Sequence, residues 1–174
     1  MADSPETESN SVVPHWEELD SKPIANCRIF DVMSKRFRHP KRGTEGDFYV
    51  IETRDWVNVL AITEDYRIVL VNQFRFGVKE TSWEIPGGVM EVGEEPISAG
   101  LRELREETGY TPGKARLLGS VRPNPAIQSN VCHIVLAEET RLTDELEWDE
   151  HEEIVTRAFP IEEVYEMAQR GEIF

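Results

Sequence analysis

The stretch GVMEVGEEPISAGLRELREETGY, residues 88–110, decides the fold of this chain. Pro96 suits the first turn of a helix, because its missing N–H would have no partner there in any case. Gly109 suits the position just after a helix, where a left-handed backbone is needed, and Pro112 prevents continuation. The stretch therefore predicts a helix over residues 96–108.

One face of the predicted helix is apolar. At about 100° per residue, a single stripe collects the side chains that we expect to pack on a sheet. The stripe consists of Ile97, Leu101, Leu104 and Thr108. Ala99 and Gly100 lie one turn before the acidic side chains of the helix, and their small size is expected to leave room above those carboxylates.

Three carboxylates project from another face of the same helix. They belong to Glu103, Glu106 and Glu107, at the spacing i, i+3 and i+4. At an effective dielectric constant near 20, repulsion between two such charges in contact costs on the order of a few kcal/mol. A divalent cation that prefers oxygen ligands, Mg²⁺ or Mn²⁺, relieves this repulsion, and Arg102 can pair with Glu106 across one turn. The alternative is a solvated charged face.

The positions around these carboxylates favour the metal site. They fit the pattern G-x5-E-x7-R-E-U-x-E-E-x-G-U, in which U is aliphatic. The matching residues are Gly88, Glu94, Arg102, Glu103, Leu104, Glu106, Glu107 and Gly109. Tyr110, in the last place, departs from the pattern. The segment resembles the Nudix box, the signature of the Nudix hydrolase family.

The resemblance implies an α/β/α sandwich that cleaves a nucleoside diphosphate linked to another moiety, with the help of a divalent metal. The implied metal ligands are Glu103 and Glu107 as the principal ones, Glu106 as an additional one, and the backbone carbonyl of Gly87. Arg102 would orient these carboxylates as part of the catalytic machinery, and Glu94 would be a supporting carboxylate.

Short strands and a second helix surround the quoted stretch. Alternating or β-branched runs predict strands at 27–38, 48–53, 56–63, 67–74, 81–88, 115–121, 131–139 and 153–160. Helical periodicity predicts a closing helix over 161–171, with Gly171 as its stop. Strands mixed with two helices indicate the α/β class, with a mixed sheet covered on both faces.

The chain divides into three parts. Residues 1–14 are polar and are expected to be disordered. Residues 15–54 are expected to form a small antiparallel β-subdomain. A sheet of this size cannot bury both faces alone, so it must lie on the next domain or on a partner chain. Residues 55–174 would form the main, Nudix-like domain.

Composition excludes several classes of protein. The formal net charge is −15, so the surface repels phosphate backbones and nucleic-acid binding is disfavoured. The two cysteines, Cys27 and Cys132, form no disulfide framework or zinc motif and fit a reducing compartment. The start of the chain lacks the features of a signal peptide, and no apolar run is long enough to span a bilayer. These features predict a cytoplasmic protein that does not enter membranes.

Segments outside the box resemble the ADP-ribose and nucleoside diphosphate sugar pyrophosphatase branch of the family. QFRFGVKETSWEIPGG, residues 73–88, implies Arg75 as a ligand of phosphate or sugar and Glu84 as a hydrogen-bond acceptor for a base or ribose. The alternatives are a surface arginine and an exposed strand residue. Pro125 also marks this branch and its substrate site. Ala126 stands where glycine usually follows, which points to a broader sugar-nucleotide specificity.

The segment WDEHEEIVTRAFPIEEV, residues 148–164, resembles the acidic loop of the same branch. It implies Glu150 as the catalytic base and Glu152 as a further metal ligand, although the two roles could be reversed. The alternative is a solvated acidic loop. Members of this branch are typically homodimers that exchange their N-terminal strands. Arg28 and Arg36 would then reach the base bound by the partner chain.

The sequence thus predicts a Mg²⁺- or Mn²⁺-dependent Nudix hydrolase. Its substrates would be nucleoside diphosphate sugars, ADP-ribose among them, cleaved to a nucleoside monophosphate and a sugar phosphate. One alternative is a Nudix hydrolase of nucleoside triphosphates or dinucleoside polyphosphates. Another is a Nudix-fold regulator that binds nucleotides without turnover, against which the full set of box glutamates argues.

Overall fold

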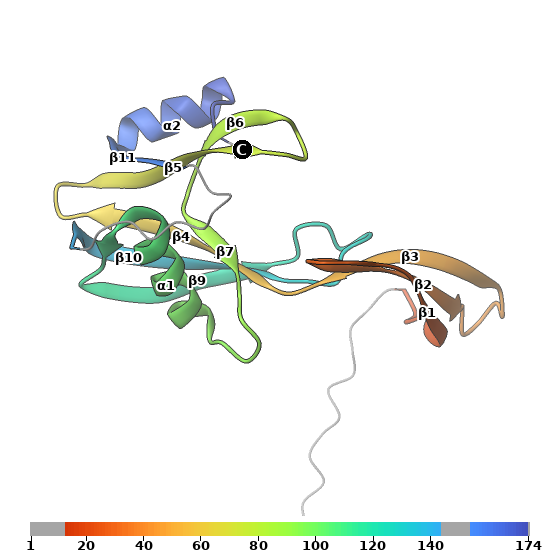
Figure 1. Cartoon of the computed structure of the whole chain (residues 1–174). Coiled ribbons are helices and arrows are strands. Elements are labelled where there is room, and N and C mark those ends of the chain that lie inside the picture. Colours follow the sequence, from red (N-terminus) through yellow and green to blue (C-terminus); the bar gives the residue numbers. More distant parts are fainter. Residues whose placement is uncertain (1–12, 144–153, 174) are drawn as a thin grey trace, which may run out of the picture. The chain divides into compact units, whose positions relative to one another are not determined.

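The computed structural model describes residues 13–143 and 154–173 (Figure 1). The chain forms two compact units. One consists of Met1–Thr53 and Ala126–Ser129, and the other of Arg54–Pro125 and Asn130–Phe174. Most of the tail expected at 1–14 lies outside the described residues. The sequence predicts a domain boundary between residues 54 and 55, and the first compact unit of the structure ends at Thr53 before the chain enters the second.

The first unit is a three-stranded antiparallel sheet in the order β1 (Glu17–Cys27), β2 (Phe30–Arg38) and β3 (Glu45–Thr53). β1 was not expected, because EELDSKPIANC has few β-branched residues; its pairing with β2 along most of its length overrides that weak propensity. The segment 126–129 joins the sheet through Ile51, whose N–H donates to the Ile127 carbonyl at 2.7 Å.

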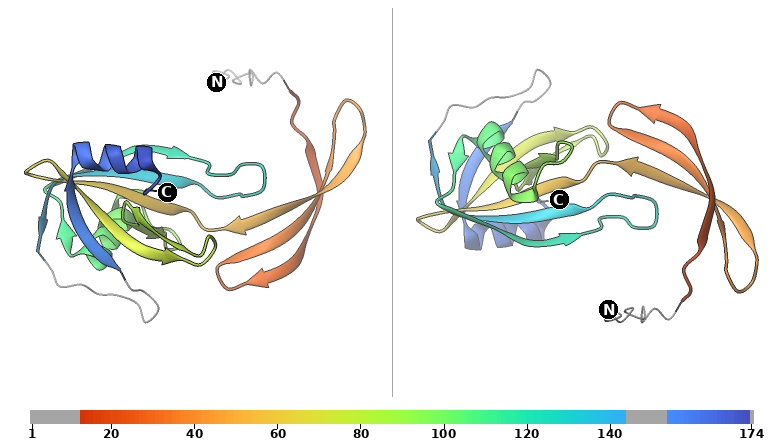
Figure 2. Two further views of the ribbon diagram at one scale, coloured as in Figure 1. Left: turned by 90° about the horizontal axis from the view of Figure 1, so that it is seen from above. Right: turned by 90° about the horizontal axis from the view of Figure 1, so that it is seen from below.

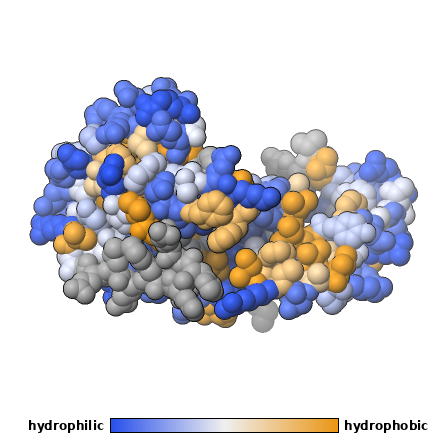
Figure 3. Space-filling view, turned by 45° about the horizontal axis from the view of Figure 1, so that its top comes forward, coloured by the Kyte–Doolittle hydropathy of each residue, from blue (hydrophilic) through white to orange (hydrophobic). Residues whose placement is uncertain are grey.

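This small sheet has little core of its own. His39 is the only buried residue in the described part of the unit. Trp16 packs edge-on against both His39 and Phe48. Several apolar side chains of this unit stay at the surface, among them Ile29 and Tyr49. Figure 3 shows hydrophobic residues exposed on one face of the molecule. Apolar surface of this kind on so small a sheet favours contact with a further protein surface.

The described part of the second unit contains an eight-stranded sheet and two helices. Its central strands follow the order β11-β5-β4-β10-β8. The remaining strands pair at the sides of this path, β6 with β5, β7 with β4 and β9 with β10. The strands are β4 (Trp56–Thr63), β5 (Arg67–Arg75), β6 (Glu80–Glu84), β7 (Gly87–Val89), β8 (Tyr110–Thr111), β9 (Lys114–Val121), β10 (Cys132–Leu142) and β11 (Val155–Pro160). β4 and β10 run parallel, while the other described pairs are antiparallel.

The two helices cover opposite faces of this sheet. Val57, Val59 and Val69 pack with Leu104 of α1 (Pro96–Thr108). Leu70, the next residue along β5, joins a second cluster beneath α2 (Ile161–Arg170). Successive side chains of a strand point to opposite faces, so the two clusters lie on the two sides of the sheet. Figure 2 shows α2 in front in one view and α1 in front in the opposite view. The predicted α/β fold with a mixed sheet and a small antiparallel sheet is confirmed.

The buried face of α1 differs from the expected stripe. Ile97 is exposed, whereas Ala99 and Gly100 are buried. A Cβ built on Gly100 would lie 3.1 Å from a methyl group of Val59. Gly100 therefore brings the helix close to the sheet, and the expectation that these small residues leave room above the carboxylates is wrong.

The predicted strand over 81–88 is divided into β6 and β7. Pro86 lies between the two short strands and has no N–H to donate to a ladder. Its carbonyl accepts the N–H of Val59 at 2.8 Å, which fixes the break against β4. β7 therefore begins at Gly87, directly beside the acidic helix. None of the helices in the described ranges has the length and apolar character to cross a membrane.

Candidate active site

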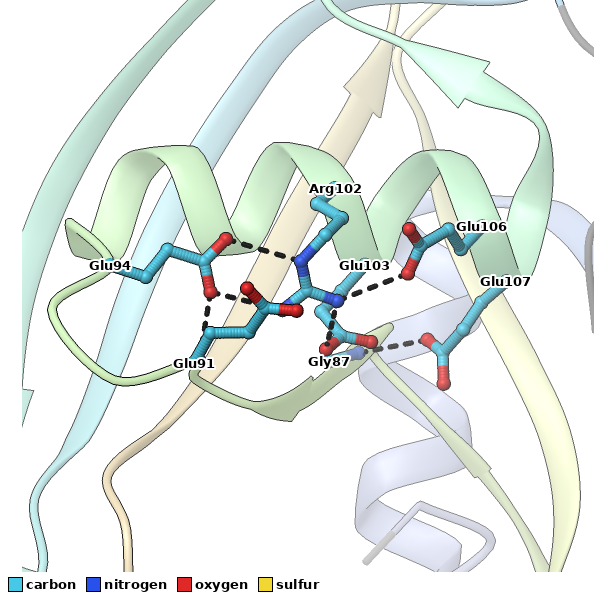
Figure 4. Close-up of polar contacts among 7 residues, drawn as sticks. All are labelled: Gly87, Glu91, Glu94, Arg102, Glu103, Glu106 and Glu107. Carbon is cyan, nitrogen blue, oxygen red and sulfur yellow. Dashed lines mark hydrogen bonds and ion pairs between the residues drawn. The ribbon is translucent and has the colours of Figure 1, made fainter. Parts of the chain in front are cut away.

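Arg102 lies at the centre of the acidic cluster on α1 (Figure 4). Its Nη1 donates to Glu103 Oε1 at 2.8 Å and to Glu106 Oε2 at 3.0 Å. Its Nε and Nη2 each donate to one carboxylate oxygen of Glu94 at 3.1 Å. The structure thus contains the ion pair expected from the i, i+4 spacing of Arg102 and Glu106. One guanidinium serves three carboxylates.

Glu94 connects the preceding loop to this cluster. Its Oε2 also accepts the backbone N–H of Glu91 at 3.0 Å. The hydrogen bonds from Arg102 hold the pKa of Glu94 below its usual value, against the opposing effect of burial. In return, the hydrogen bonds to Glu94 raise the pKa of Arg102 further above its already high value. Both groups therefore stay charged at neutral pH.

The two glycines of β7 form a thin wall against the helix. The N–H of Gly87 donates to Glu107 Oε2 at 2.9 Å, and Glu107 is buried. A Cβ on Gly88 would collide with the carboxylate of Glu103. Glycine at position 88 is thus required for Glu103 to lie where it does. The box places its first glycine against its first helical glutamate.

The chemistry of this group suits a divalent metal. Carboxylate oxygens are the ligands that Mg²⁺ and Mn²⁺ prefer, and the backbone cradle at Gly88 that a Cβ would fill keeps the carboxylate of Glu103 against β7. Among the described residues, no three Asp, Glu, His or Cys side chains converge closely enough to form a metal-binding group. Arg102 supplies positive charge between Glu103 and Glu106. The carboxylates of α1 thus have the ligand chemistry that a divalent ion prefers, and they lie on one helix.

A cavity of about 350 Å³ adjoins the glycine wall. It is formed by the start of β4, the end of β5, the end of β6 and all of β7. The residues lining it are Trp56, Asn58, Arg75, Glu84, Gly87, Gly88 and Val89. Because Gly87 and Gly88 lack side chains and lie against Glu107 and Glu103, no more than their backbone separates the cavity from the acidic cluster.

Arg75 and Glu84 face each other in this cavity. Arg75 Nη2 donates to Glu84 Oε2 at 2.6 Å, and Nε donates to Oε1 at 2.9 Å. The exposed fraction is 46% for the Arg75 side chain and 15% for that of Glu84. Such a two-point pair holds the guanidinium in a fixed orientation. The structure thus brings both predicted substrate residues to the same cavity, and their roles stay predictions.

Pro125, Arg28 and Arg36 are not among the residues that line this cavity. Pro125 is exposed in the loop between β9 and β10. Arg28 lies in the turn between β1 and β2, and Arg36 pairs with acidic side chains of β3 within the first unit. Glu150 and Glu152 lie outside the described residues.

Three lining residues, Trp56, Asn58 and Val89, were missed from the sequence. Trp56 and Asn58 alternate along β4 with Val57 and Val59, which pack under α1. In WVNVLAIT, an asparagine interrupts a run of residues that otherwise suits a buried strand. A polar residue within such a run is the signal that could have identified Asn58 as part of a site.

Comparison with known proteins identifies the family. Residues 52–173 match the model of the NUDIX domain. The chain belongs to the Nudix family. The prediction of a Nudix hydrolase, made from residues 88–110, is confirmed. Members of this family generally need a divalent metal.

Relatives of this Nudix chain carry the names expected from its sequence. It is 32% identical over 164 residues to an ADP-ribose pyrophosphatase of Bacillus subtilis, covering 91% of this chain and 88% of the relative. It is 28% identical to an ADP-ribose pyrophosphatase of Mycobacterium tuberculosis, with 91% and 77% covered. The crystal structure of an ADP compounds hydrolase matches with a TM-score of 0.80 at 22% identity, over 91% of this chain and 85% of the other. This last likeness supports the fold.

Proposed function

We propose that this Nudix hydrolase cleaves the pyrophosphate bond of nucleoside diphosphate sugars, ADP-ribose among them, with Mg²⁺ or Mn²⁺. The products are a nucleoside monophosphate and a sugar phosphate. The observation that carries the proposal is the glycine wall, which separates the cavity from Glu103 and Glu107 by no more than backbone. The names of the relatives over most of the chain support the choice of substrate.

Each residue of the acidic cluster would have its own role in metal binding. Glu103, Glu106 and Glu107 would hold the metal, together with the Gly87 carbonyl. Bound there, a divalent ion neutralises the phosphates and lowers the pKa of a water molecule. Arg102 keeps the carboxylates in place through Glu94, so that their mutual repulsion does not splay them apart.

The cavity would hold the part of the substrate next to the pyrophosphate. Arg75, fixed by Glu84, offers guanidinium edges to a phosphate or sugar oxygen. Glu84 could in turn accept a hydrogen bond from a base or ribose. Pro125 stays a proposed part of the substrate site. We keep Glu150 as the proposed general base and Glu152 as a further ligand.

The first unit would serve assembly. Its sheet has a buried residue only at His39 in the described part and exposes several apolar side chains. A homodimer formed through this unit, with Arg28 and Arg36 reaching the partner's substrate, is part of the proposal. A cytoplasmic location, predicted from composition, also remains a proposal.

The substrate proposal is tested by turnover of a panel with Mg²⁺. The panel contains ADP-ribose, ADP-glucose, GDP-mannose, UDP-glucose, deoxynucleoside triphosphates and diadenosine tetraphosphate. We expect nucleoside monophosphate from the sugar nucleotides, no turnover with EDTA, and recovery when Mg²⁺ or Mn²⁺ is returned in excess. Turnover of triphosphates or the tetraphosphate alone would overturn the substrate class. Absence of any turnover with metal present would favour the nucleotide-binding regulator.

A further inference from the structure

Asn58 is a polar side chain within the apolar run of β4 that extends from Trp56 to Ile62. Its neighbours Val57 and Val59 are fully buried beneath α1. Because side chains alternate along a strand, Asn58 points to the opposite face, where it lines the cavity with Trp56. Burying an amide costs free energy unless it forms hydrogen bonds. A hydrophobic residue would suit the strand better, so the amide at this position calls for a partner.

The described residues supply no such partner. In the parts of the chain that the structure describes, residues 13–143 and 154–173, the amide of Asn58 makes no hydrogen bond. Its side chain is half-buried rather than solvated on a free surface. A half-buried amide that lines a cavity retains one hydrogen-bond acceptor and two donors for a bound molecule.

The amide also lies next to the acidic cluster. Its Oδ1 is 2.6 Å from the point where a Cβ on Gly87 would stand. The N–H of that same glycine donates to Glu107. A pyrophosphate held at Glu103 and Glu107 would therefore have its attached group beside Asn58. A carboxylate here would repel the phosphates, whereas a neutral amide does not.

The size and chemistry of the cavity limit which part of the substrate it can hold. A volume of about 350 Å³ is at the low end for small-molecule sites, which suits one ring-sized group rather than a whole nucleoside diphosphate sugar. The two charged residues of the lining, Arg75 and Glu84, pair with each other, and the Asn58 amide is uncharged. A sugar hydroxyl both donates and accepts, so it matches an amide, which does the same.

We propose that Asn58 is a specificity residue that hydrogen-bonds a sugar hydroxyl of the nucleoside diphosphate sugar. The proposal rests on the function proposed above. The hydroxyl belongs either to the sugar on the distal phosphate or to the ribose of the nucleoside, and both sources share this chemistry. Asn58 binds the substrate and takes no part in holding the metal.

The test combines removal of the Asn58 amide with removal of substrate hydroxyls, in the manner of a double-mutant cycle. Purified full-length chain and N58A are compared on three compounds with Mg²⁺. These are ADP-ribose, the methyl ester of ADP at its distal phosphate, and ADP-ribose lacking both hydroxyls of the adenosine ribose. A compound that is not cleaved is measured as a competitive inhibitor of ADP-ribose cleavage. N72A is the matched control, because Asn72 lies in β5 of the same sheet and does not line the cavity.

We expect N58A to lower kcat/KM for ADP-ribose by about threefold to tenfold, the value of one hydrogen bond, mainly through KM. For whichever analogue lacks the partner hydroxyl, the penalty should vanish. N72A should behave as the native chain does. An equal penalty on all three compounds, or a fall in kcat alone, would show that Asn58 positions the glycine wall and would overturn the proposal. So would an N58A that cleaves ADP-ribose normally.

The outcomes also separate this inference from the proposed function. If the native chain neither cleaves nor binds any of the three compounds, the proposed function fails, and the role of Asn58 fails with it. If the native chain cleaves ADP-ribose and the cycle shows no coupling, only the role of Asn58 is overturned. Thermal unfolding of N58A and N72A is measured alongside, and unchanged midpoints are expected for both.

Discussion

At the scale of single residues, the acidic cluster depends on one cation. Arg102 donates to Glu94, Glu103 and Glu106, and its side chain is only 26% exposed. Three carboxylates on one helix repel each other, and a partly buried guanidinium offsets that repulsion. The arginine thus stabilises the arrangement of the carboxylates on this helix.

A substitution at Glu107 can distinguish a role in metal binding from a role in folding. Glutamine keeps the volume of this buried side chain and an oxygen that can accept the Gly87 N–H. We expect Glu107→Gln to leave the unfolding midpoint within a few degrees while lowering kcat by roughly a hundredfold or more, because metal contributions to a barrier are several kcal/mol. Steady-state kinetics at saturating Mg²⁺ measure this, and an unchanged kcat there would exclude Glu107 as a ligand.

The two cysteines should differ in reactivity. Cys132 is 5% exposed, and burial raises the pKa of its thiol, whereas Cys27 is partly exposed. A raised pKa means less thiolate at pH 8, and only the thiolate reacts. We expect iodoacetamide at pH 8 to label Cys27 rapidly and Cys132 only after denaturation, as followed by peptide mass spectrometry. In Cys27→Ser the fast phase should disappear; equally fast labelling of Cys132 would contradict its burial.

At the scale of elements, β7 can pack where it does because its two glycines have no Cβ atoms. A Cβ on Gly87 would run into the backbone carbonyl of Val57, which cannot move without the strand. The atoms nearest to a Cβ on Gly88 would be those of the Glu103 carboxylate, the end of a side chain that can rotate away. Adjacent glycines in one short strand thus serve different purposes, one for folding and the other for the site.

This contrast gives a paired prediction. Gly87→Ala should destabilise the fold by about 1–3 kcal/mol, through strain in the strand. Gly88→Ala should keep most of the stability and lower kcat by roughly a hundredfold, because it displaces Glu103. Urea unfolding and steady-state kinetics on both variants distinguish the two. Gly119→Ala is the control, because a Cβ there meets nothing within 4 Å. Loss of stability in Gly88→Ala as large as in Gly87→Ala would refute the distinction.

At the scale of the whole molecule, the two units differ in how they are stabilised. The second unit has core clusters on both faces of its sheet. The first unit has a buried residue only at His39 in its described part and presents apolar side chains outward. A three-stranded sheet in this condition is expected to gain stability from a partner surface.

Self-association can be tested with two matched tyrosines. Tyr49 in the first unit and Tyr165 on α2 are 64% and 65% exposed. We expect sedimentation velocity at micromolar concentration to show a dimer, Tyr49→Ser to weaken it by at least several-fold in Kd, and Tyr165→Ser to leave it unchanged. A native chain that sediments as a monomer would remove the proposed shared site.

Much of this molecule follows from local sequence. The bounds of α1 follow from Pro96 and Gly109, whose backbone preferences act without tertiary help; Gly109 adopts a φ of 72° and donates to Arg105. The strands of the central sheet follow from β-branched runs. The family and its acidic cluster follow from spaced residues within 88–110. These features depend on residues close together in the chain, so the sequence by itself determined them.

Other features depend on contacts between distant segments. β1 exists because β2 offers it a pairing edge, and the buried face of α1 is set by Gly100 meeting valines of two strands. Asn58 lines the cavity only because β4 pairs with β7, which places its amide beside Gly87. Local patterns determine which elements form and which charges they carry. Only the tertiary structure decided which side chains share a cavity, because that depends on how the strands and helices pack together.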